Sequence, residues 1–144
     1  MRRVPARAPG VREKRLRADL GGPRRDGVRR GDALIVPLEC SLVGHEGAVR
    51  VSAGSLAERA LGVERTVERY HCSYGLSRAF LDVLGEHGLR FSGVDDNDDV
   101  RIAELPGHPF FLVTLFQPEL AGDGGRAHPI ITALAAAAHA RQPA

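Results

Sequence analysis

The alternation of apolar and polar residues predicts a series of short β-strands from residue 33 onward. Ala48–Val51 and Leu89–Val94 alternate with the two-residue period of a strand that is covered on one face. Thr66–Cys72 and Val100–Leu105 are two further predicted strands. The acidic run Asp95–Asp99 predicts a solvated tight turn. The strands on either side of this turn therefore form a hairpin.

Two runs of consecutive apolar residues predict strands that are buried. The shorter run is Ala33–Leu38, which Pro37 ends or places at an edge. Pro109–Phe116 is the most apolar stretch of the chain, and we expect a central strand covered by helices on both faces. This strand would deliver Gln117 and Glu119 to its carboxyl end, where ligand sites gather in α/β sheets. Alternate residues should face opposite sides, with Phe111, Val113 and Leu115 on one face and Leu112, Thr114 and Phe116 on the other.

Three segments have the features of helices. Ser55–Leu61 has Ser55 as its N-cap and Glu58 three residues later, which is the spacing of a capping box. Ser77–Glu86 places its apolar residues on one face and is expected to cover the sheet. Pro129–Arg141 is the last predicted helix. Strands interleaved with helices predict an α/β fold with a mixed sheet flanked by helices.

Length and composition indicate one globular domain. The chain has 144 residues, of which 43% are hydrophobic and 26% charged, enough for a single core. No apolar run reaches the roughly 18–20 residues that a membrane-spanning helix needs, and the start lacks the apolar region of a signal peptide. The two cysteines suggest neither a metal pair nor a disulfide framework. These features predict a cytoplasmic protein without a membrane partner.

The first 30 residues differ from the rest of the chain. They hold ten Arg and one Lys against three acidic residues, whereas residues 31–144 hold nine basic and fifteen acidic residues. One interpretation is a disordered arm, and a less favoured one is a nucleic-acid-binding tail, because clustered Arg contacts phosphates. A third, slightly favoured interpretation is a misplaced start or a frameshift in a GC-rich gene, because 19 of the 20 basic residues are Arg. We therefore treat 1–30 and 31–144 as separate regions.

Five motifs in the right order resemble the C-terminal region of CTP synthase, a class I glutamine amidotransferase domain. That family has the patterns V-E-R-H-R-H-R-Y, a glycine-terminated strand, E-x-P-x-H-P-[FW]-F, F-H-P-E and a late H-P. The matching segments here are Val67–Leu89, where the first pattern is followed by a helix and Gly88-Leu89 as in the family, Phe91–Gly93, Glu104–Phe111, Phe116–Glu119 and His128–Pro129. A stand-alone group related to this region, with some selenoprotein members, is similar in the segments Cys72–Leu76 and Leu115–Pro118. The resemblance implies a partial class I amidotransferase fold, which is flavodoxin-like, with the N-terminal half and its nucleophile missing.

The resemblance also implies a degenerate catalytic site. Family members attack glutamine with a Cys thiolate in a G-x-C-x-G turn, activated by a His–Glu pair. Neither Cys40 nor Cys72 has that setting, and Gln117 stands where the family has the catalytic His. Glu119 keeps the position of the triad acid. Ser73 replaces the Arg that pairs with the substrate carboxylate, so Cys72, Ser73 and Tyr74 are degenerate positions of the glutamine pocket.

Three functions remain open at this stage. The favoured one is a binding or regulatory module, or a fragment of one, without glutaminase activity. The second is an enzyme with a thiol-dependent activity around Cys72, Gln117 and Glu119, and the third is an Arg-tailed nucleic-acid binder. Cys72 is then either a packed thiol or a redox or ligand-contact thiol that lines the degenerate pocket beside Gln117. The partner would be a small molecule, another protein, or a second copy bound through an exposed side of the sheet.

The sequence indicates no cofactor and no metal site. The six His residues lack the spacing of metal ligands. The run Asp95–Asp99 lacks the Gly and the distal Glu of a calcium loop, and no Lys-Ser/Thr pair follows the glycines of residues 122–125. Nothing resembles the ATP or UTP sites of the ligase domain of CTP synthase, so this chain would not make CTP alone.

Overall fold

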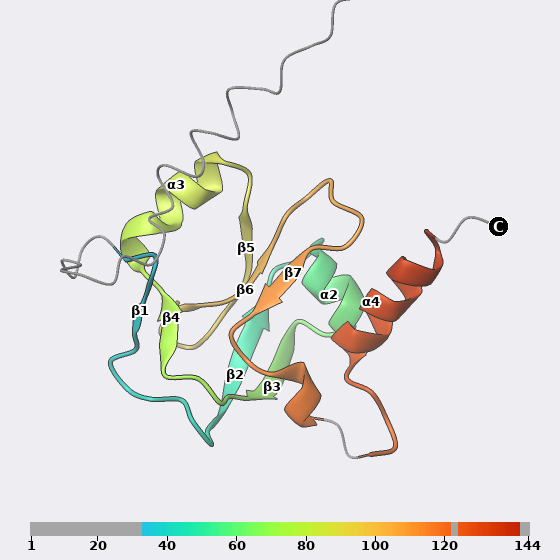
Figure 1. The fold of residues 1–144 in the computed structure, drawn as a ribbon, viewed down its shortest axis with the longest axis horizontal. Helices are drawn as coiled ribbons and strands as arrows, with labels where there is room; N and C mark the ends of the chain where they lie inside the picture. Colours follow the sequence, from blue (N-terminus) through green and yellow to red (C-terminus); the bar gives the residue numbers. More distant parts are fainter. Residues whose placement is uncertain (1–32, 122–123, 142–144) are drawn as a thin grey trace, which may run out of the picture. The chain divides into compact units, whose positions relative to one another are not determined.

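The computed structural model describes residues 33–121 and 124–141 (Figure 1). The Arg-rich residues 1–30 lie outside this part, so the interpretations of that segment stay predictions. The described elements in chain order are β1 (Ile35–Pro37), β2 (Glu46–Val51), α2 (Leu56–Leu61), β3 (Arg65–Arg69), β4 (Tyr74–Leu76), the 3-10 helix η1 (Arg78–Phe80), α3 (Leu81–Glu86), β5 (Arg90–Val94), β6 (Val100–Glu104), β7 (Leu112–Thr114), the 3-10 helix η2 (Pro118–Ala121) and α4 (Pro129–His139).

The strands form one five-stranded sheet and one two-stranded ribbon. The sheet has the order β3-β2-β5-β6-β7, and the ribbon pairs β1 with β4. The α/β class is confirmed. Every pairing between described strands is antiparallel, so the parallel strands of the expected mixed sheet are not found in this part of the chain.

The predicted hairpin is present, and its turn is held by the backbone and by one side chain. Asp95 N donates to Asp99 O at 3.0 Å, while Asp95 Oδ1 accepts hydrogen bonds from the N–H groups of Asn97 and Asp99. Strand β5 carries a bulge at Gly93. A Cβ at Gly93 would lie 2.6 Å from Ile102 Cγ1 on β6, so only glycine fits between the two strands.

The predicted strand Thr66–Cys72 is shorter in the structure than expected. Strand β3 stops at Arg69, and Tyr70 N instead donates to His45 O at 2.9 Å. The chain then bends and pairs with β1 from Tyr74 onward. As a result, Cys72 lies in the connection between two sheets.

The two apolar runs are less buried in the structure than their composition predicts. Ala33–Leu38 does contain β1, but Ile35 and Pro37 are exposed, so this run is not a buried strand. The prediction of a central strand over Pro109–Phe116 is wrong: β7 is three residues long and lies at the edge of the sheet, with Val113 52% exposed. The predicted alternation is seen only in part: Phe111 and Val113 are exposed and Phe116 is buried, but Leu115 packs against the core as Leu112 does.

Helix α2 begins and ends as its sequence predicts. Ser55 Oγ accepts a hydrogen bond from Glu58 N at 2.9 Å, and Glu58 accepts one from Gly54 N at 2.6 Å. Gly62 ends the helix in the left-handed region at φ 72°. Helix α2 packs against β5, β6 and α4, and lies beside α4 in Figure 1. The predicted Ser77–Glu86 helix is present as η1 and α3, and Figure 1 shows α3 well away from β7 rather than over it, so the expected cover of β7 by this helix is not found.

The core lies between the sheet and the pair α2 and α4. Tyr70 and Phe116 meet edge to face there, with ring centroids 6.2 Å apart. The buried apolar residues of this core are Val49, Val51, Ala57, Tyr70, Ile102, Phe116 and Ile130. Within the described residues, no helix is both long and apolar enough to cross a membrane.

Candidate functional site

Gln117 lies where the exits of β7 and β3 meet. Its backbone N–H donates to Arg69 O at 3.1 Å, and its side-chain Oε1 accepts a hydrogen bond from His71 N at 2.6 Å. The two bonds hold the chain just before Cys72. The structure therefore brings Gln117 next to the connection that carries Cys72, Ser73 and Tyr74.

The side chains of that connection bond locally. Cys72 Sγ lies 3.1 Å from Tyr74 O and 3.4 Å from Tyr74 N, within its own turn. Ser73 Oγ is 2.9 Å from Ser41 Oγ in the segment after β1. Tyr74 is exposed. None of these contacts joins the Cys72 thiol to the amide of Gln117 in the described part of the chain.

Glu119 makes no hydrogen bond with Gln117 or with the connection that carries Cys72, among the described residues. It is exposed in η2 and makes no hydrogen bond or ion pair with any described residue. A nucleophile, a base and an orienting acid must form a chain of hydrogen bonds to act together. Cys72, Gln117 and Glu119 form no such chain among the described residues.

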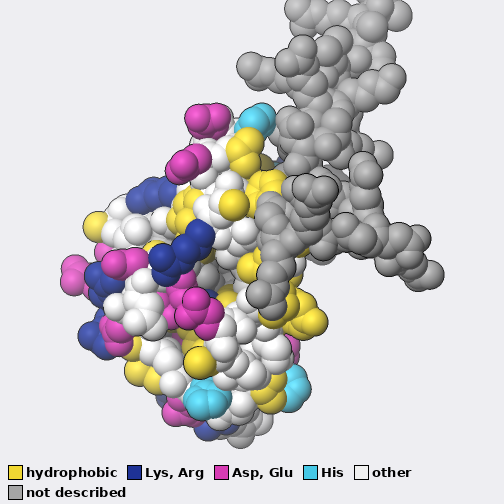
Figure 2. Space-filling model, turned by 90° about the vertical axis from the view of Figure 1, so that its left-hand side faces the viewer, with side chains coloured by type: hydrophobic (Ala, Val, Ile, Leu, Met, Phe, Trp, Pro, Cys, Tyr) yellow, Lys and Arg dark blue, Asp and Glu magenta, His cyan; other side chains and the backbone are white. Residues whose placement is uncertain are grey.

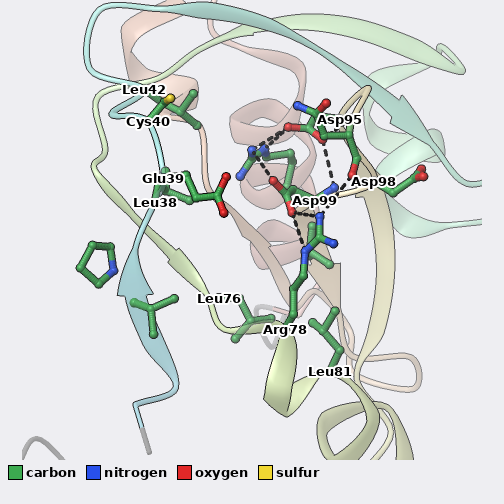
Figure 3. A pocket seen from close by; sticks show the side chains of 15 residues that line it. Leu38, Glu39, Cys40, Leu42, Leu76, Arg78, Leu81, Asp95, Asp98 and Asp99 are labelled. Carbon is green, nitrogen blue, oxygen red and sulfur yellow. Dashed lines mark hydrogen bonds and ion pairs between the residues drawn. The ribbon is translucent and has the colours of Figure 1, made fainter. Parts of the chain in front are cut away.

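A cavity of about 740 Å³ lies beside β1 and faces the hairpin of β5 and β6 (Figure 3). One wall is apolar and includes Leu38 and Leu76, and the other is the acidic hairpin turn. Cys40 also lines it. Glu39 points toward the charged wall from the opposite side in Figure 3. Sequence analysis did not find this cavity.

Two arginines form ion pairs with the carboxylates of the charged wall. Arg101 is buried, and its Nη2 and Nε lie 2.6 Å and 3.1 Å from Asp95 Oδ2. Arg78 Nε donates to Asp99 Oδ1 at 3.0 Å, and Arg101 Nη2 lies 3.5 Å from Asp99 Oδ2. Figure 2 shows acidic and basic side chains side by side on this face. The carboxylates are therefore held in place by the protein itself.

The pKa of Asp95 reflects both its burial and its partners. Burial alone would raise the pKa, because it disfavours the charged carboxylate. Hydrogen bonds from Arg101 and from the N–H groups of Asp99 and Asn97 stabilise the charge and bring the pKa below its ordinary value. Asp95 is thus ionised near neutral pH and fixes the turn.

The acidic run was predicted to be a solvated turn, and its middle residues Asp96, Asn97 and Asp98, which are exposed, agree with that. What the sequence did not indicate is that Arg78 and Arg101 would contact it, since these residues come from η1 and β6. No group of three or more His, Cys, Asp or Glu residues that could hold a metal occurs within the described residues.

The sequence relatives are CTP synthases. No family model matches the chain. It is 40% identical over 95 residues to the CTP synthase of Synechococcus sp. strain CC9311, covering 65% of this chain and 17% of the relative. The CTP synthase of Methanothrix thermoacetophila is 39% identical over 89 residues, covering 62% and 16%, and that of Rubrobacter xylanophilus is 43% identical over 82 residues, covering 56% and 15%. The chain thus spans less than a fifth of these relatives.

The fold is that of glutamine amidotransferase domains. The glutaminase domain of Trypanosoma brucei CTPS with bound acivicin matches with a TM-score of 0.68 at 22% identity, over 77% of this chain and 47% of that domain. A GMP synthase protein from Thermoplasma acidophilum matches with a TM-score of 0.55 at 11% identity, over 74% and 48%. At these identities the similarity concerns the fold alone.

Proposed function

We propose that this chain, a relative of the glutamine amidotransferase domain of CTP synthase, is a non-hydrolytic binding or regulatory module. The observation that carries the proposal is the hydrogen bond of 2.6 Å from His71 N to Gln117 Oε1. In the motif that Phe116–Glu119 resembles, this position belongs to the base that activates the thiol. Here it holds two segments of backbone together.

The chemistry of an amide supports this assignment. A general base must accept a proton in the transition state, and glutamine does not do so near neutral pH. The amide oxygen of Gln117 already accepts the N–H of His71. Cys72 cannot take over the role of an activated nucleophile from its present contacts, because Tyr74 backbone atoms are its hydrogen-bond partners.

The substrate side of the site supports the same proposal. Ser73 stands where the resemblance places an Arg that pairs with the glutamine carboxylate. A hydroxyl supplies neither the charge nor the bidentate geometry of a guanidinium. The hydroxyl of Ser73 is also engaged with Ser41. Glutamine would therefore bind weakly at this position.

A binding role remains compatible with the structure. The cavity of about 740 Å³ falls within the size of small-molecule sites, and it combines apolar and charged walls. Cys40 and Cys72 are both free thiols. Because disulfides are rare in reducing compartments and thiols persist there, we also propose a cytoplasmic location.

An ammonia-release assay on the purified full chain tests the proposal. We expect no release from glutamine above buffer, and none from Gln117→His, because the thiol of Cys72 bonds to backbone atoms of Tyr74 and is not placed for the restored imidazole to activate. Glutaminase activity in the wild type that disappears in Cys72→Ala would overturn the proposal and support the alternative of a thiol-dependent enzyme. NMR titration with glutamine adds a binding readout. The amides of residues 72–74 are expected to stay unshifted.

A further inference from the structure

Strand β7 presents an unpaired edge. Its only neighbour among the described strands is β6, with Val113 opposite Ala103. Residues along an antiparallel strand direct their backbone groups alternately toward and away from the neighbour. Leu115 N donates to Arg101 O of the neighbouring segment at 2.9 Å, so the odd-numbered residues face β6. Leu112 and Thr114 therefore direct their N–H and C=O groups away from the sheet.

The open part of this edge is bounded on both sides by local hydrogen bonds. Before it, Phe110 N donates to His108 Nδ1 at 3.2 Å. After it, Phe116 O accepts a hydrogen bond from Thr114 Oγ1 at 2.8 Å. The backbone groups that stay open belong to two residues placed symmetrically around Val113.

The side chains on the outer face of this strand are apolar. Val113 is 52% exposed and Phe111 is 37% exposed. Proteins usually protect edge strands with charges, prolines or bulges, because such edges pair with other chains. Residues 110–116 contain no charged residue and no proline. Apart from the short length of β7, this edge therefore lacks the features that prevent pairing.

We propose that the edge pairs with β7 of a second copy of this chain, antiparallel and across a twofold axis at Val113. In this register Leu112 of each copy lies opposite Thr114 of the other, and each open N–H meets an open C=O. The two copies of Val113 face each other as a non-hydrogen-bonded pair, with Cα atoms about 4.5 Å apart. Their exposed side chains then cover one another.

The second copy is the favoured occupant because the edge complements itself. A twofold interface requires a patch that matches its own rotated image. The two open residues are equidistant from Val113, and residues 110–116 themselves carry no charged side chain that would repel its counterpart. The contact is also short, since β7 has three residues. We therefore expect a weak dimer whose interface is smaller than that of a typical stable protein complex.

This inference goes beyond the proposed function and does not depend on it. The dimer forms or fails to form whether or not the chain hydrolyses glutamine. The experiment that tests it measures the oligomeric state and not glutaminase activity.

The experiment is sedimentation velocity over a dilution series of the full chain. We expect a concentration-dependent monomer–dimer equilibrium in the wild type. Val113→Lys and Val113→Glu should each be monomeric, because like charges meet at the axis, and an equimolar mixture of the two should dimerise again. Val67→Lys is the matched control: Val67 is 65% exposed on β3, at the opposite edge of the sheet, and this variant should dimerise like the wild type.

Recovery in the mixture separates loss of the interface from loss of the fold, because misfolded variants would not restore each other. Circular dichroism of each variant checks the fold independently. A wild type that stays monomeric throughout the series, a mixture that does not dimerise, or a Val67→Lys variant that loses the dimer equally would each overturn the proposal.

Discussion

Tyr70 is a core residue whose hydroxyl has no hydrogen-bond partner among the described residues. Its ring packs against Phe116, and the guanidinium of Arg101 lies 5.9 Å from the ring centroid. Burial raises the pKa of Tyr70 to about 12, Arg101 lowers it, and Asp95 and Glu68 raise it further. The neutral phenol is therefore the form that this core accepts.

Tyr70→Phe tests the contribution of that hydroxyl. Removing an unpaired buried hydroxyl should leave stability at pH 8 unchanged or raise it by up to about 1 kcal/mol. The folded pKa of about 12 lies above the unfolded value of 10.0. The stability that Tyr70 contributes is thus present below pH 10 and is lost as the pH rises toward 12. Urea unfolding at pH 8 and pH 11 should show a smaller alkaline loss in the variant, and an equal loss would contradict this account.

Gln117 offers a second test at the scale of one residue. Gln117→Ala removes the acceptor for His71 N, and a typical hydrogen bond contributes about 1 kcal/mol. Glu119→Ala is the matched control two residues later, since Glu119 is exposed and without a described partner, and it should change stability by less than about 0.5 kcal/mol. Chemical denaturation measures both. Equal effects would show that Gln117 does not hold the two segments together.

At the scale of elements, helix α2 shows what local sequence determines. Ser55 is the N-cap and Glu58 lies in the first turn, as the sequence predicts, while Gly62, whose role was not predicted, ends the helix. One contact comes from far away. Both oxygens of the Glu104 carboxylate on β6 accept hydrogen bonds from N–H groups of the first turn, at 3.2 Å from Leu56 N and Ala57 N. No local pattern indicates that contact.

Ser55 at the N-cap of α2 and Ser92 on β5 are both fully buried, so their hydroxyls can be compared directly. Ser55→Ala should cost about 1 kcal/mol, because it removes the acceptor for Glu58 N. Ser92 is equally buried on β5, but its hydroxyl has no partner among the described residues. Ser92→Ala should therefore change stability by less than about 0.5 kcal/mol. Thermal unfolding of both variants checks the difference, and a larger loss in Ser92→Ala would refute the assignment.

Strand β7 shows what local sequence does not determine. The run Phe110–Phe116 has the composition of a strand covered on both sides, and that is why it was predicted to be central. Its place in the sheet depends on which strand, if any, lies along its second edge. That information is not contained in the run itself. Strand geometry alone predicts that alternate residues face opposite sides, and Val113 and Phe116 differ in exposure as that rule requires, but the run does not indicate that the face of Phe111 and Val113 is left uncovered.

At the scale of the whole molecule, the same distinction applies to the candidate site. Resemblance of ordered motifs pointed to the Gln117 region and the segment Cys72–Tyr74 as a candidate site, and this stays a prediction. The cavity was missed, since its walls come from β1 and from the hairpin of β5 and β6, which are distant in sequence. The pairing of Arg78 with Asp99 likewise joins residues 21 positions apart. Only the tertiary arrangement brings these groups together.

Glu68 on β3 and His128 at the N-cap of α4 form a buried pair. His128 Nε2 lies 3.2 Å from both carboxylate oxygens of Glu68, and the side chains are only 7% and 2% exposed. His128 Nδ1 accepts a hydrogen bond from Ile130 N at the start of α4, so Nε2 carries the proton that is donated to Glu68. Thr66 Oγ1 donates to the same carboxylate at 2.8 Å. The pair thus joins β3 to the first turn of α4.

A double-mutant cycle measures this connection. His128→Ala leaves the Glu68 carboxylate buried with Thr66 as its remaining described donor and also removes the N-cap of α4, so we expect a loss of about 3 kcal/mol. Adding Glu68→Gln should restore part of it, because the buried charge is gone, and the coupling should exceed about 1 kcal/mol. The exposed pair of Arg69 and Glu46, 2.8 Å apart, is the control, and its coupling should lie within about 0–1 kcal/mol. Equal coupling in the two cycles would show that the buried pair does not hold α4 against the sheet.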